Sequence, residues 1–373
     1  MGPPLLYSGE RSDGEFGRAV CVEIALYILG FLMVVMTAVP LFKHEAWWIR
    51  VFDFPRLQIV FIALAVLVLY IALVGVGGWL GIAFIILLAA SLVYQAYMMF
   101  PYTRLARKQV QDATDVNSPK ISILFANVLM TNRKADRVKT LIQQWDPDIL
   151  LLVETDEWWL EQMTELECRY PYTVLHPLDN TYGMLLFSRL ELANPEVKFL
   201  IQDDIPSIHS GVMLENGSRV EIRCLHPRPP VPNEESDSLP RDAEILIVGK
   251  ENREDPRPFI VFGDLNDVAW SRTNYLFQDI SGLLDPRVGR GFYHTFHADI
   301  PLLRFPLDHF FHSKHFRVAD FRRLPNIGSD HFPVYIKLSL EWDAPIVQEE
   351  LAAEPEERIE AERTIETALA REG

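Results

Sequence analysis

The sequence predicts an α/β domain with mixed sheets, preceded by a helical membrane region and followed by an acidic tail. Two stretches within the first hundred residues carry no charge, and residues 341–373 are rich in Glu and Ala. Between residues 120 and 340, short apolar runs alternate with amphipathic segments. This alternation is typical of layered α/β folds, and because βαβ spacing occurs only in places, it indicates mixed rather than parallel sheets.

The charge-free stretches predict three transmembrane helices. Ile24–Phe42 has 19 residues, which reach about 28 Å as a helix, close to the roughly 30 Å of a bilayer's hydrocarbon core. Leu57–Thr103 has 47 residues and is too long for one span. Three glycines interrupt it: Gly75, Gly77 and Gly78. We interpret it as helices Leu57–Val74 and Trp79–Phe100 joined by a turn, whereas a cleaved signal peptide would explain only one span.

Five parts follow from these patterns. They are an N-terminal segment (1–18), a three-helix transmembrane region (19–103), a linker (104–119), an α/β domain (120–340) and an acidic tail (341–373), which we expect to be solvated and helical or disordered. Net charge is −1 for residues 1–100, −7 for 101–340 and −8 for 341–373. This acidity argues against a tight, sequence-independent binder of duplex nucleic acid. Three cysteines exclude a disulfide framework.

Basic residues near the predicted spans indicate how the chain is oriented. Six lie on the side of the 43–56 loop and the α/β domain: Lys43, Arg50, Arg56, Arg104, Arg107 and Lys108. Only Arg11 and Arg18 lie on the other side. By the positive-inside rule, this count predicts an integral membrane protein whose α/β domain is cytoplasmic.

Apolar runs define the strands of the α/β domain. The predicted strands are Ile121–Ala126, Ile149–Val153, Met184–Phe187, Val212–Leu214, Val220–Cys224, Phe259–Phe262, Asp308–Phe311 and Val334–Leu340. Helical spacing predicts helices over Val138–Trp145, with Asn132 as the N-cap, and over Ala243–Lys250. Asn216-Gly217 predicts a hairpin turn, and the proline-rich segment 225–241 predicts a long functional loop.

Polar side chains with catalytic potential lie at the ends of these strands. They are Asn127, Glu154, His226, Asp264, Asn266, Asp308, Asp330 and His331. A carboxylate after an apolar strand is costly unless it faces a metal, a partner or water. Phosphoester hydrolysis requires a hard cation on oxygen ligands, a base for water and donors for the developing charge, and this set supplies all three. Taken singly, each residue has an ordinary explanation as a helix cap, a turn or a surface group.

The combination of motifs resembles the endonuclease/exonuclease/phosphatase superfamily, the deoxyribonuclease I-like phosphoesterases. The motifs are Gly263-Asp-Leu-Asn266 and Ser329-Asp-His331, in this order after Glu154. The resemblance covers roughly Ile121 to Leu340 and implies a four-layered α/β/β/α sandwich with two mixed sheets. The three spans are similar to those of a membrane-tethered branch of the superfamily. Some members of that branch present the domain outside the cytoplasm, which opposes the charge count.

The resemblance also implies a metal site. A residue in the position of Glu154 holds a catalytic Mg²⁺ or Mn²⁺, supported by an amide in the position of Asn127. Asp330 contributes at the same metal.

Roles for the remaining residues follow from the same resemblance. His331 acts as general base or phosphate-binding acid, and Asp308 orients it. Asp264 and Asn266 position the attacking water and a phosphate oxygen. His226 is similar to a second histidine that some members place beside the scissile phosphate.

Together these patterns predict a membrane-anchored, divalent-metal-dependent phosphoester hydrolase. A lipid-linked phosphate or diphosphate suits an acidic domain near a bilayer, because such a substrate arrives by lateral diffusion rather than by electrostatic steering. One alternative is an endo- or exonuclease acting on nucleic acid, although long basic or aromatic insertions are missing from the sequence. The other alternative is a membrane-anchored, non-catalytic binding module, which the complete set of acids, amides and histidines disfavours.

Overall fold

The computed structural model describes residues 9–231 and 234–372. Residues 1–8 of the predicted N-terminal segment lie outside this range. Contacts divide the chain into two compact units. The helical unit comprises the described residues up to His44 together with Trp48–Phe100, and the α/β unit comprises Glu45–Trp47 and the chain from Pro101 onward.

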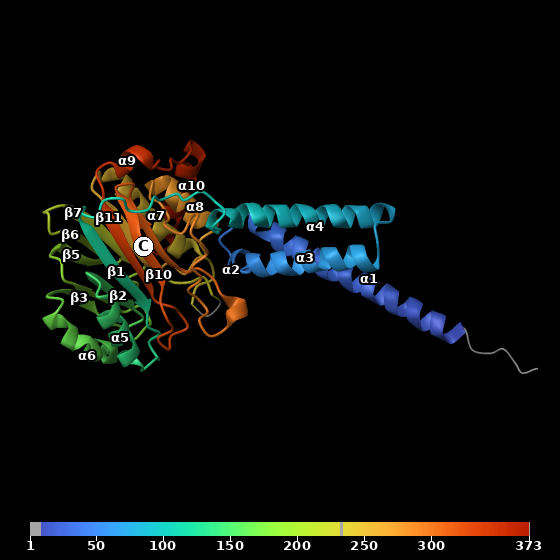
Figure 1. Ribbon diagram of the computed structural model, residues 1–373, viewed down its shortest axis with the longest axis horizontal. Helices are drawn as coiled ribbons and strands as arrows, with labels where there is room; N and C mark the ends of the chain where they lie inside the picture. Colours follow the sequence, from blue (N-terminus) through green and yellow to red (C-terminus); the bar gives the residue numbers. More distant parts are fainter. Residues whose placement is uncertain (1–8, 232–233, 373) are drawn as a thin grey trace, which may run out of the picture. The chain divides into compact units, whose positions relative to one another are not determined.

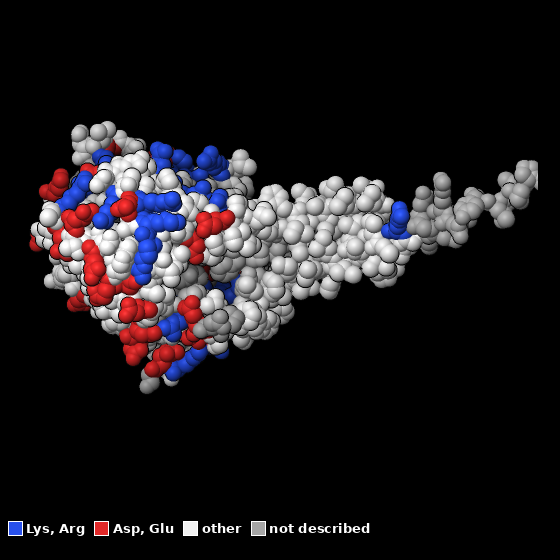
Figure 2. Space-filling view, turned by 90° about the horizontal axis from the view of Figure 1, so that it is seen from below, with Lys and Arg blue, Asp and Glu red and all other residues white. Residues whose placement is uncertain are grey.

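Three long helices form the helical unit. They are α1 (Gly9–Ala38), α3 (Arg56–Leu73) and α4 (Gly78–Met99), and the short elements near them are η1 (Val39–Leu41), α2 (Trp47–Arg50), η2 (Val51–Asp53) and η3 (Phe100–Tyr102). Each of the three long helices contains a stretch long and apolar enough to cross a membrane, and on the face drawn in Figure 2 the described part of this unit shows almost no charged side chains. The first helix begins at Gly9, well before the predicted Ile24, because the polar residues ahead of the apolar stretch continue the same helix.

Small residues allow these helices to approach closely. A Cβ added at Gly30 of α1 would lie 2.4 Å from Cζ of Phe84 on α4, so only glycine fits there. A buried polar network also links the helices: the Thr37 and Ser91 hydroxyl groups lie 2.6 Å apart, and Gln95 Nε2 donates to Thr37 Oγ1 at 3.0 Å. Arg56 Nη1 donates to Gln95 Oε1 at 3.1 Å, which extends the network to α3.

Two mixed sheets form the α/β unit (Figure 1). The first sheet has the order β10-β11-β1-β2-β4-β3 and the second β5-β6-β7-β8-β9. The strands are β1 (Lys120–Asn127), β2 (Ile149–Val153), β3 (Tyr172–His176), β4 (Met184–Ser188), β5 (Leu192–Lys198), β6 (Ser207–Met213), β7 (Arg219–Leu225), β8 (Phe259–Asp264), β9 (Asp308–His312), β10 (Phe316–Arg323) and β11 (Val334–Leu340). Each sheet contains one parallel pair, β1–β2 and β7–β8, among antiparallel neighbours.

Successive side chains of each strand point to opposite faces of the sheet, and this alternation produces three apolar layers. On β1, Ile121, Ile123 and Phe125 face the core between the sheets, whereas Leu124 and Ala126 face helices α5 and α6. The outer face of the second sheet packs against α7, α8 and α10. The helices of this unit are α5 (Ala135–Trp145), α6 (Glu157–Met163), α7 (Leu239–Glu254), α8 (Arg272–Ser281), α9 (Ala344–Val347) and α10 (Pro355–Glu372), with η4 (Thr164–Cys168) and η5 (Pro301–Leu303). The predicted α/β/β/α sandwich is therefore confirmed.

Three strands that the sequence did not reveal are edge strands, and the central strand β6 (Ser207–Met213) begins five residues before the predicted Val212–Leu214. β3 and β10 are the two edges of the first sheet, and β5 is an edge of the second. β3 and β5 are largely half-buried or exposed, and β10 is exposed over part of its length. They therefore lack the continuous apolar run that marks a central strand. The Asn216-Gly217 turn joins β6 and β7 as predicted, with Gly217 at φ 81°.

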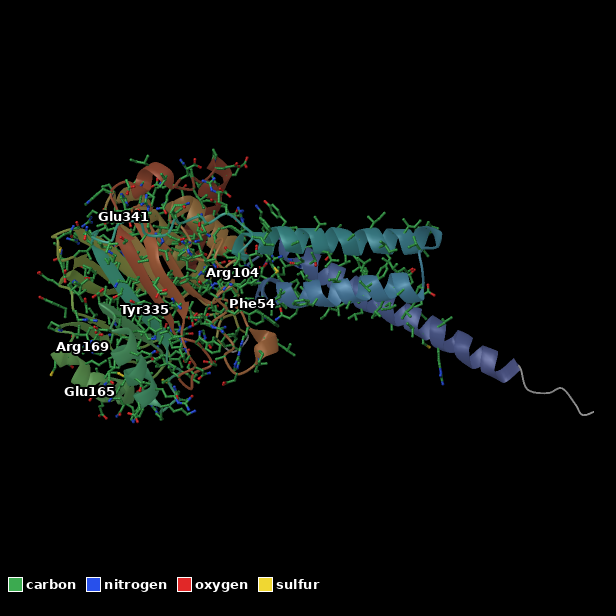
Figure 3. The ribbon with its side chains drawn as sticks, viewed as in Figure 1. Phe54, Arg104, Glu165, Arg169, Tyr335 and Glu341 are labelled. Carbon is green, nitrogen blue, oxygen red and sulfur yellow. The ribbon has the colours of Figure 1, made fainter. Side chains whose placement is uncertain are left out.

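The predicted N-cap of α5 is wrong. The capping position is Lys134, and no side chain caps the helix. Asn132 instead donates from Nδ2 to the carbonyl of Val128 at 3.0 Å. It thereby stabilises the loop before the helix. Beyond its first turn, α5 packs on the first sheet, where the ring of Trp145 lies 4.8 Å from that of Tyr335 (labelled in Figure 3).

The acidic tail is helical over most of its length. Ala361 and Ala368 of α10 are buried against the helices that cover the second sheet. Arg272 of α8 pairs with Glu360 at 2.7 Å, and Arg371 pairs with Asp237 at 2.7 Å. Part of the tail is thus packed on the α/β unit rather than fully solvated.

Candidate active site

Two parallel strand pairs bring four polar residues to one edge of the sandwich. Asn127 ends β1 beside Val153, so Glu154 leaves β2 next to it. In the second sheet, Leu225 of β7 aligns with Gly263 of β8, so His226 and Asp264 follow at neighbouring strand ends. The sheets are joined at this edge, because Asn127 Nδ2 donates to Glu154 Oε1 at 2.6 Å and to Asp264 Oδ2 at 3.1 Å.

A glycine permits the close approach of β7 and β8. Gly263 has φ 147°, and a Cβ there would lie 1.9 Å from the carbonyl oxygen of Leu225. Any other residue would push the strands apart at the point where Asp264 begins. The Gly-Asp pair of the motif is therefore a steric requirement of this strand end.

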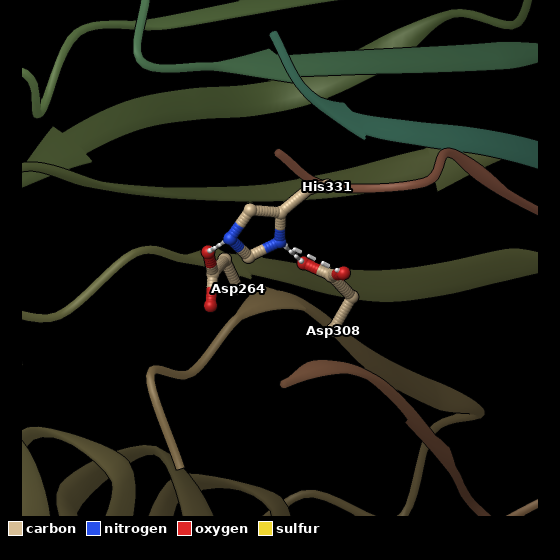
Figure 4. A group of neighbouring side chains, drawn as sticks. All are labelled: Asp264, Asp308 and His331. Carbon is tan, nitrogen blue, oxygen red and sulfur yellow. Dashed lines mark hydrogen bonds and ion pairs between the residues drawn. The ribbon is translucent and has the colours of Figure 1, made fainter. Parts of the chain in front are cut away.

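Asp308 and Asp264 hold His331 between them (Figure 4). His331 Nδ1 lies 3.1 Å from both carboxylate oxygens of Asp308, and Nε2 lies 3.5 Å from Asp264 Oδ2. All three side chains are buried, and their ligand atoms lie within 4.8 Å of one another. Asp308 therefore fixes one tautomer and orientation of the imidazole and leaves Nε2 directed at Asp264.

The backbone is strained at two of these residues. Glu154 has φ 58° and Asn266 has φ 51°, both in the left-handed region. For residues other than glycine this conformation costs roughly 1–2 kcal/mol and occurs often at functional sites. Asn266 is held by its backbone N–H, which donates to Asp264 Oδ1 at 3.0 Å, and by Nδ2, which donates to the carbonyl of Pro227 at 3.0 Å.

Burial and crowding of like charges dominate the electrostatics. Burial raises the pKa of Glu154 to about 7; Asp264 and Asp330 raise it further, while Asn127 and His331 oppose the rise. Burial likewise raises the pKa of Asp264. For His331, burial disfavours the cation, but Asp308, Asp264 and Asp330 outweigh it and raise the pKa to about 10. The imidazolium is thus the positive charge that partly balances the carboxylates.

His226 and Asp330 complete the predicted set. Burial lowers the pKa of His226 to about 4, and Asp264 and His331 both act on it electrostatically. Its Nδ1 is buried and has no hydrogen-bond partner among the described residues, and its ring lies 5.2 Å from that of Tyr182. Asp330 influences both Glu154 and His331, and Ser329 Oγ donates to it at 3.3 Å. All eight predicted residues therefore lie at this edge of the sandwich.

Arg241 of α7 is a positioning residue that the sequence did not indicate. Its Nη1 donates to the carbonyl of Asn266 at 2.7 Å, and Nη2 lies 3.4 Å from Asp267 Oδ2. This buried guanidinium supports the turn after β8 from the helix layer. Nothing in the local sequence distinguishes it from a surface arginine, because its contact with residue 266 depends on the packing of α7.

The donor set fits a divalent cation. Four carboxylates, of which Asp264 and Asp308 are buried and Glu154 and Asp330 half-buried, lie around one imidazolium, which leaves an excess of negative charge. Hard oxygen ligands of this kind suit Mg²⁺ or Mn²⁺. Asn127 directs its amide nitrogen at the carboxylates, and its Oδ1 accepts from the Leu129 N–H at 3.0 Å, so in this arrangement it orients Glu154.

A two-sheet sandwich with such a site defines a class of protein, the hydrolases that act on phosphoester bonds. Within that class the chain matches the model of the Endonuclease/Exonuclease/phosphatase family over residues 124–331, and it belongs to this family. The match begins in β1 and ends at His331, so it spans the strand ends described above.

Several solved structures are similar to this chain. D. rerio TDP2 complexed with single-strand DNA product is 16% identical, with a TM-score of 0.49, covering 59% of this chain and 99% of that chain. The human Nocturnin catalytic domain with bound sulfate is 18% identical, with a TM-score of 0.48 and coverage of 61% and 96%. An endonuclease/exonuclease/phosphatase from Beutenbergia cavernae is 16% identical, with a TM-score of 0.49 and coverage of 60% and 72%. No curated protein matches the sequence.

Proposed function

We propose that the chain is a membrane-anchored, divalent-metal-dependent phosphoester hydrolase that acts on a lipid-linked phosphate or diphosphate. The observation that carries the hydrolytic part is the bridge from Asn127 to Glu154 and Asp264, beside the Asp308–His331 pair. Three helices of sufficient length and apolarity support the anchoring.

Glu154 and Asp330 would hold the Mg²⁺ or Mn²⁺ ion, with Asn127 orienting Glu154. When bound, the ion would polarise a phosphoryl oxygen and offset the charge that develops during displacement. The remaining residues act around the phosphate. We assign the role of each residue from which of its side-chain atoms already form hydrogen bonds within the chain.

His331 acts as the phosphate-binding acid. Asp308 occupies Nδ1, and because the pKa of His331 is raised to about 10, Nε2 carries a proton and donates it in a hydrogen bond to the phosphate. Asp264, on the same side, accepts a hydrogen bond from the nucleophile and orients it. The Asn266 amide is already engaged with the Pro227 carbonyl, so in this arrangement Asn266 fixes the loop that carries His226.

His226 would contact the leaving-group side. With a pKa lowered to about 4 by burial, its ring is neutral at pH 7. We therefore assign it hydrogen-bond donation to the leaving oxygen rather than full proton transfer. Its Nδ1, which has no partner in the described part of the chain, is available for this contact.

A panel of substrates tests the proposal. The full chain, purified in detergent, is given a generic phosphodiester, plasmid DNA and a polyprenyl diphosphate, each with Mg²⁺, Mn²⁺ or EDTA. We expect metal-dependent release of phosphate from the polyprenyl diphosphate and its loss in Glu154→Gln. Cleavage of DNA alone would identify a nuclease instead. No cleavage of any substrate would favour the binding-module alternative.

The side of the membrane that the α/β unit faces stays a prediction. The Lys/Arg count favours the cytoplasm, and the resemblance to the membrane-tethered branch of the superfamily favours the opposite side. Labelling of exposed Cys168 by an impermeant maleimide in intact cells, with Cys21 replaced by Ser, distinguishes the two. Labelling before lysis would contradict the cytoplasmic prediction.

A further inference from the structure

A short hairpin beside the site exposes an apolar tip. Phe296 and Phe305 pair at its base, and η5 forms its tip. We call residues 296–305 the tip hairpin. Ile300, Leu302 and Leu303 are 42%, 80% and 47% exposed. Neighbouring large apolar side chains with this exposure typically mark an interaction surface.

The base of the tip hairpin contacts the site directly. The N–H of Ala298 donates to the carbonyl of Asp330 at 2.6 Å, and Phe296 forms a backbone bridge with His331. The Phe296 and His331 rings lie 5.0 Å apart. A partner bound at the tip would therefore lie close to Asp330 and His331, which we assign to the metal ion and the phosphate.

Arg304 of the tip hairpin and Arg323 beside it form no ion pair with an acidic residue in the described part of the chain. The guanidinium carbons of Arg304 and Arg323 lie 5.0 Å and 4.3 Å from the centre of the Phe332 ring. Arg304 Nη2 donates to the carbonyl of Ala298 at 2.9 Å, and Arg323 Nη1 donates to that of His294 at 2.8 Å. Two neighbouring guanidiniums without a carboxylate are suited to bind phosphate groups.

Arg323 also lines a cleft, and part of the wall of this cleft follows the end of α4 within a few residues along the chain. The cleft encloses about 520 Å³, and its wall includes Tyr102–Arg104 and Arg290–His294. Arg104, labelled in Figure 3, is exposed and follows Met99, the end of α4, by only five residues. Five residues span at most about 18 Å. If α4 crosses a bilayer, this cleft is confined to the neighbourhood of its surface.

We propose that the tip hairpin, with Arg304 and Arg323, docks onto the anionic bilayer in which the chain is anchored. The tip would enter the boundary between headgroups and acyl chains, and the two guanidiniums would bind lipid phosphates. The bilayer is the favoured partner because the charges are complementary and the chain itself limits the distance. This inference rests on the membrane anchoring proposed above.

A second exposed apolar group provides the matched control. Trp342, Ile346 and Val347, in and beside α9, are as exposed as the tip, with Ile346 at 83%. Acidic residues flank this group on both sides, including Asp343 and Glu349, and no basic residue lies between them, whereas Arg304 balances the one acidic residue of the tip hairpin, Asp299. An anionic surface would therefore repel the α9 group more strongly. It also follows β11, whose other end begins beside His331, so it lies at the opposite end of the first sheet. If exposed apolar side chains alone determined contact with the bilayer, both groups would contact it equally. The docking proposal predicts that only the tip hairpin contacts it.

Depth-dependent quenching tests the proposal on the full chain. Cys21 and Cys168 are replaced by Ser, buried Cys224 is kept, and a fluorophore is attached in turn to Leu302→Cys, Ile346→Cys and Leu64→Cys. Leu64 lies near the middle of α3 and reports insertion of the spans. The protein is placed in nanodiscs of phosphatidylcholine and phosphatidylglycerol, with or without doxyl-labelled lipid. We expect quenching at position 302 to exceed that at position 346 at least about twofold.

The outcomes separate docking from anchoring and from catalysis. Equal quenching at positions 302 and 346, with strong quenching at position 64, would overturn the docking proposal and leave the anchoring intact. No quenching at position 64 would overturn the anchoring, and the docking with it. Because fluorescence does not depend on turnover, a failure of the proposed hydrolysis would not change these readings.

The role of the guanidiniums is tested separately. Arg304→Gln with Arg323→Gln, in the Leu302→Cys protein, should reduce quenching to the level found at position 346. Lysine at both positions should restore it, since the positive charges return. Unchanged quenching in the glutamine variant would overturn the binding of lipid phosphates.

Discussion

Two of the buried polar clusters in the described residues, one in each unit, differ in charge balance. In the helical unit, Arg56 Nη2 donates to Asp53 Oδ1 at 2.5 Å, and the network continues through Gln95 to Thr37 and Ser91. Cation and anion are paired within the chain. In the α/β unit, four carboxylates share a single imidazolium, and burial raises the pKa of Glu154 to about 7.

The difference indicates what each cluster requires from outside the chain. Paired charges joined by hydrogen bonds to neutral groups need no further ion, so they can serve the packing of helices in an apolar environment. Unbalanced carboxylates are costly to bury unless a cation or a substrate joins them. The first cluster therefore has the character of a structural element, and the second that of a binding site.

The largest effect is expected from breaking the second cluster at Asp308. In Asp308→Asn the imidazole of His331 loses the carboxylate that fixes its tautomer, while the shape of the side chain is kept. We expect turnover to fall about 10²- to 10⁴-fold. Steady-state hydrolysis of whichever substrate the panel identifies measures this loss.

Metal dependence provides the control for Asp308→Asn. The Mg²⁺ concentration for half-maximal activity should stay near that of the parent, since Asp308 is engaged with His331 and not assigned to the ion. A large shift in this concentration would mean that Asp308 belongs to the metal site. It would contradict the proposal that Asp308 only orients His331.

Breaking the first cluster should affect stability rather than chemistry. Arg56→Met removes the donors to Gln95 and Asp53 and leaves a buried carboxylate without its closest cation. Loss of one partner of a buried pair costs about 3–5 kcal/mol. Unfolding of the full chain in mixed micelles, followed by helical circular dichroism, measures this change.

A second substitution makes the test of Arg56 specific. Asp53→Asn in the Arg56→Met protein removes the carboxylate that has lost its closest cation and should recover part of the lost stability. If the single variant is as stable as the parent, the network does not stabilise the helices, and the contrast between the clusters fails.

The ends of central strands could be predicted from the sequence, because an apolar run stops there and a polar residue follows it. β2 and β11 have the predicted bounds; β2 is a buried apolar run, and β11 is mainly apolar and buried apart from half-buried Lys337. Glu154 therefore stood out at the end of β2. Edge strands β3, β5 and β10 did not stand out, since solvent or loops replace the neighbour that would have imposed an apolar pattern.

Features made by distant packing could not be predicted in this way. Arg241 supports Asn266 from another layer, and the tip hairpin is built from a few long-range contacts with residues 330–332. Asn132 shows the opposite error: local spacing suggested a cap, but its side chain forms bonds across the loop instead. Local pattern determines strands and their ends, whereas tertiary contacts determine which polar groups meet.

Glu244 represents a third case, a buried carboxyl group with neither a paired cation nor crowded anions. It lies on α7, and its Oε1 has no hydrogen-bond partner among the described residues. Burial raises the pKa of Glu244 from 4.5 to about 8. The folded chain therefore keeps the proton up to about pH 8, whereas the unfolded chain releases it near pH 4.5, so stability falls as pH rises across this window.

Glu244→Gln removes this dependence, because an amide stays neutral at every pH. We expect the variant and the parent to have similar melting temperatures near pH 5, and the variant to become the more stable by about 1–2 kcal/mol near pH 8. Thermal unfolding of the full chain at four values of pH measures the difference. A constant offset at all four would show that the carboxyl group is not neutral when buried.

Glu251 on the same helix supplies the control of opposite sign and the smallest expected effect. Burial opposes its charge, but His209, whose Nδ1 lies 3.4 Å from Oε2, and the hydrogen bond from Arg223 outweigh burial and lower the pKa of Glu251 to about 2. Its charge therefore stabilises the fold above about pH 4.5, and this contribution is lost as pH falls toward 2. Glu251→Gln should destabilise the chain by about 1 kcal/mol at neutral pH, where Glu244→Gln stabilises it. Destabilisation by both substitutions at pH 8 would show that loss of packing, not charge, governs these two positions.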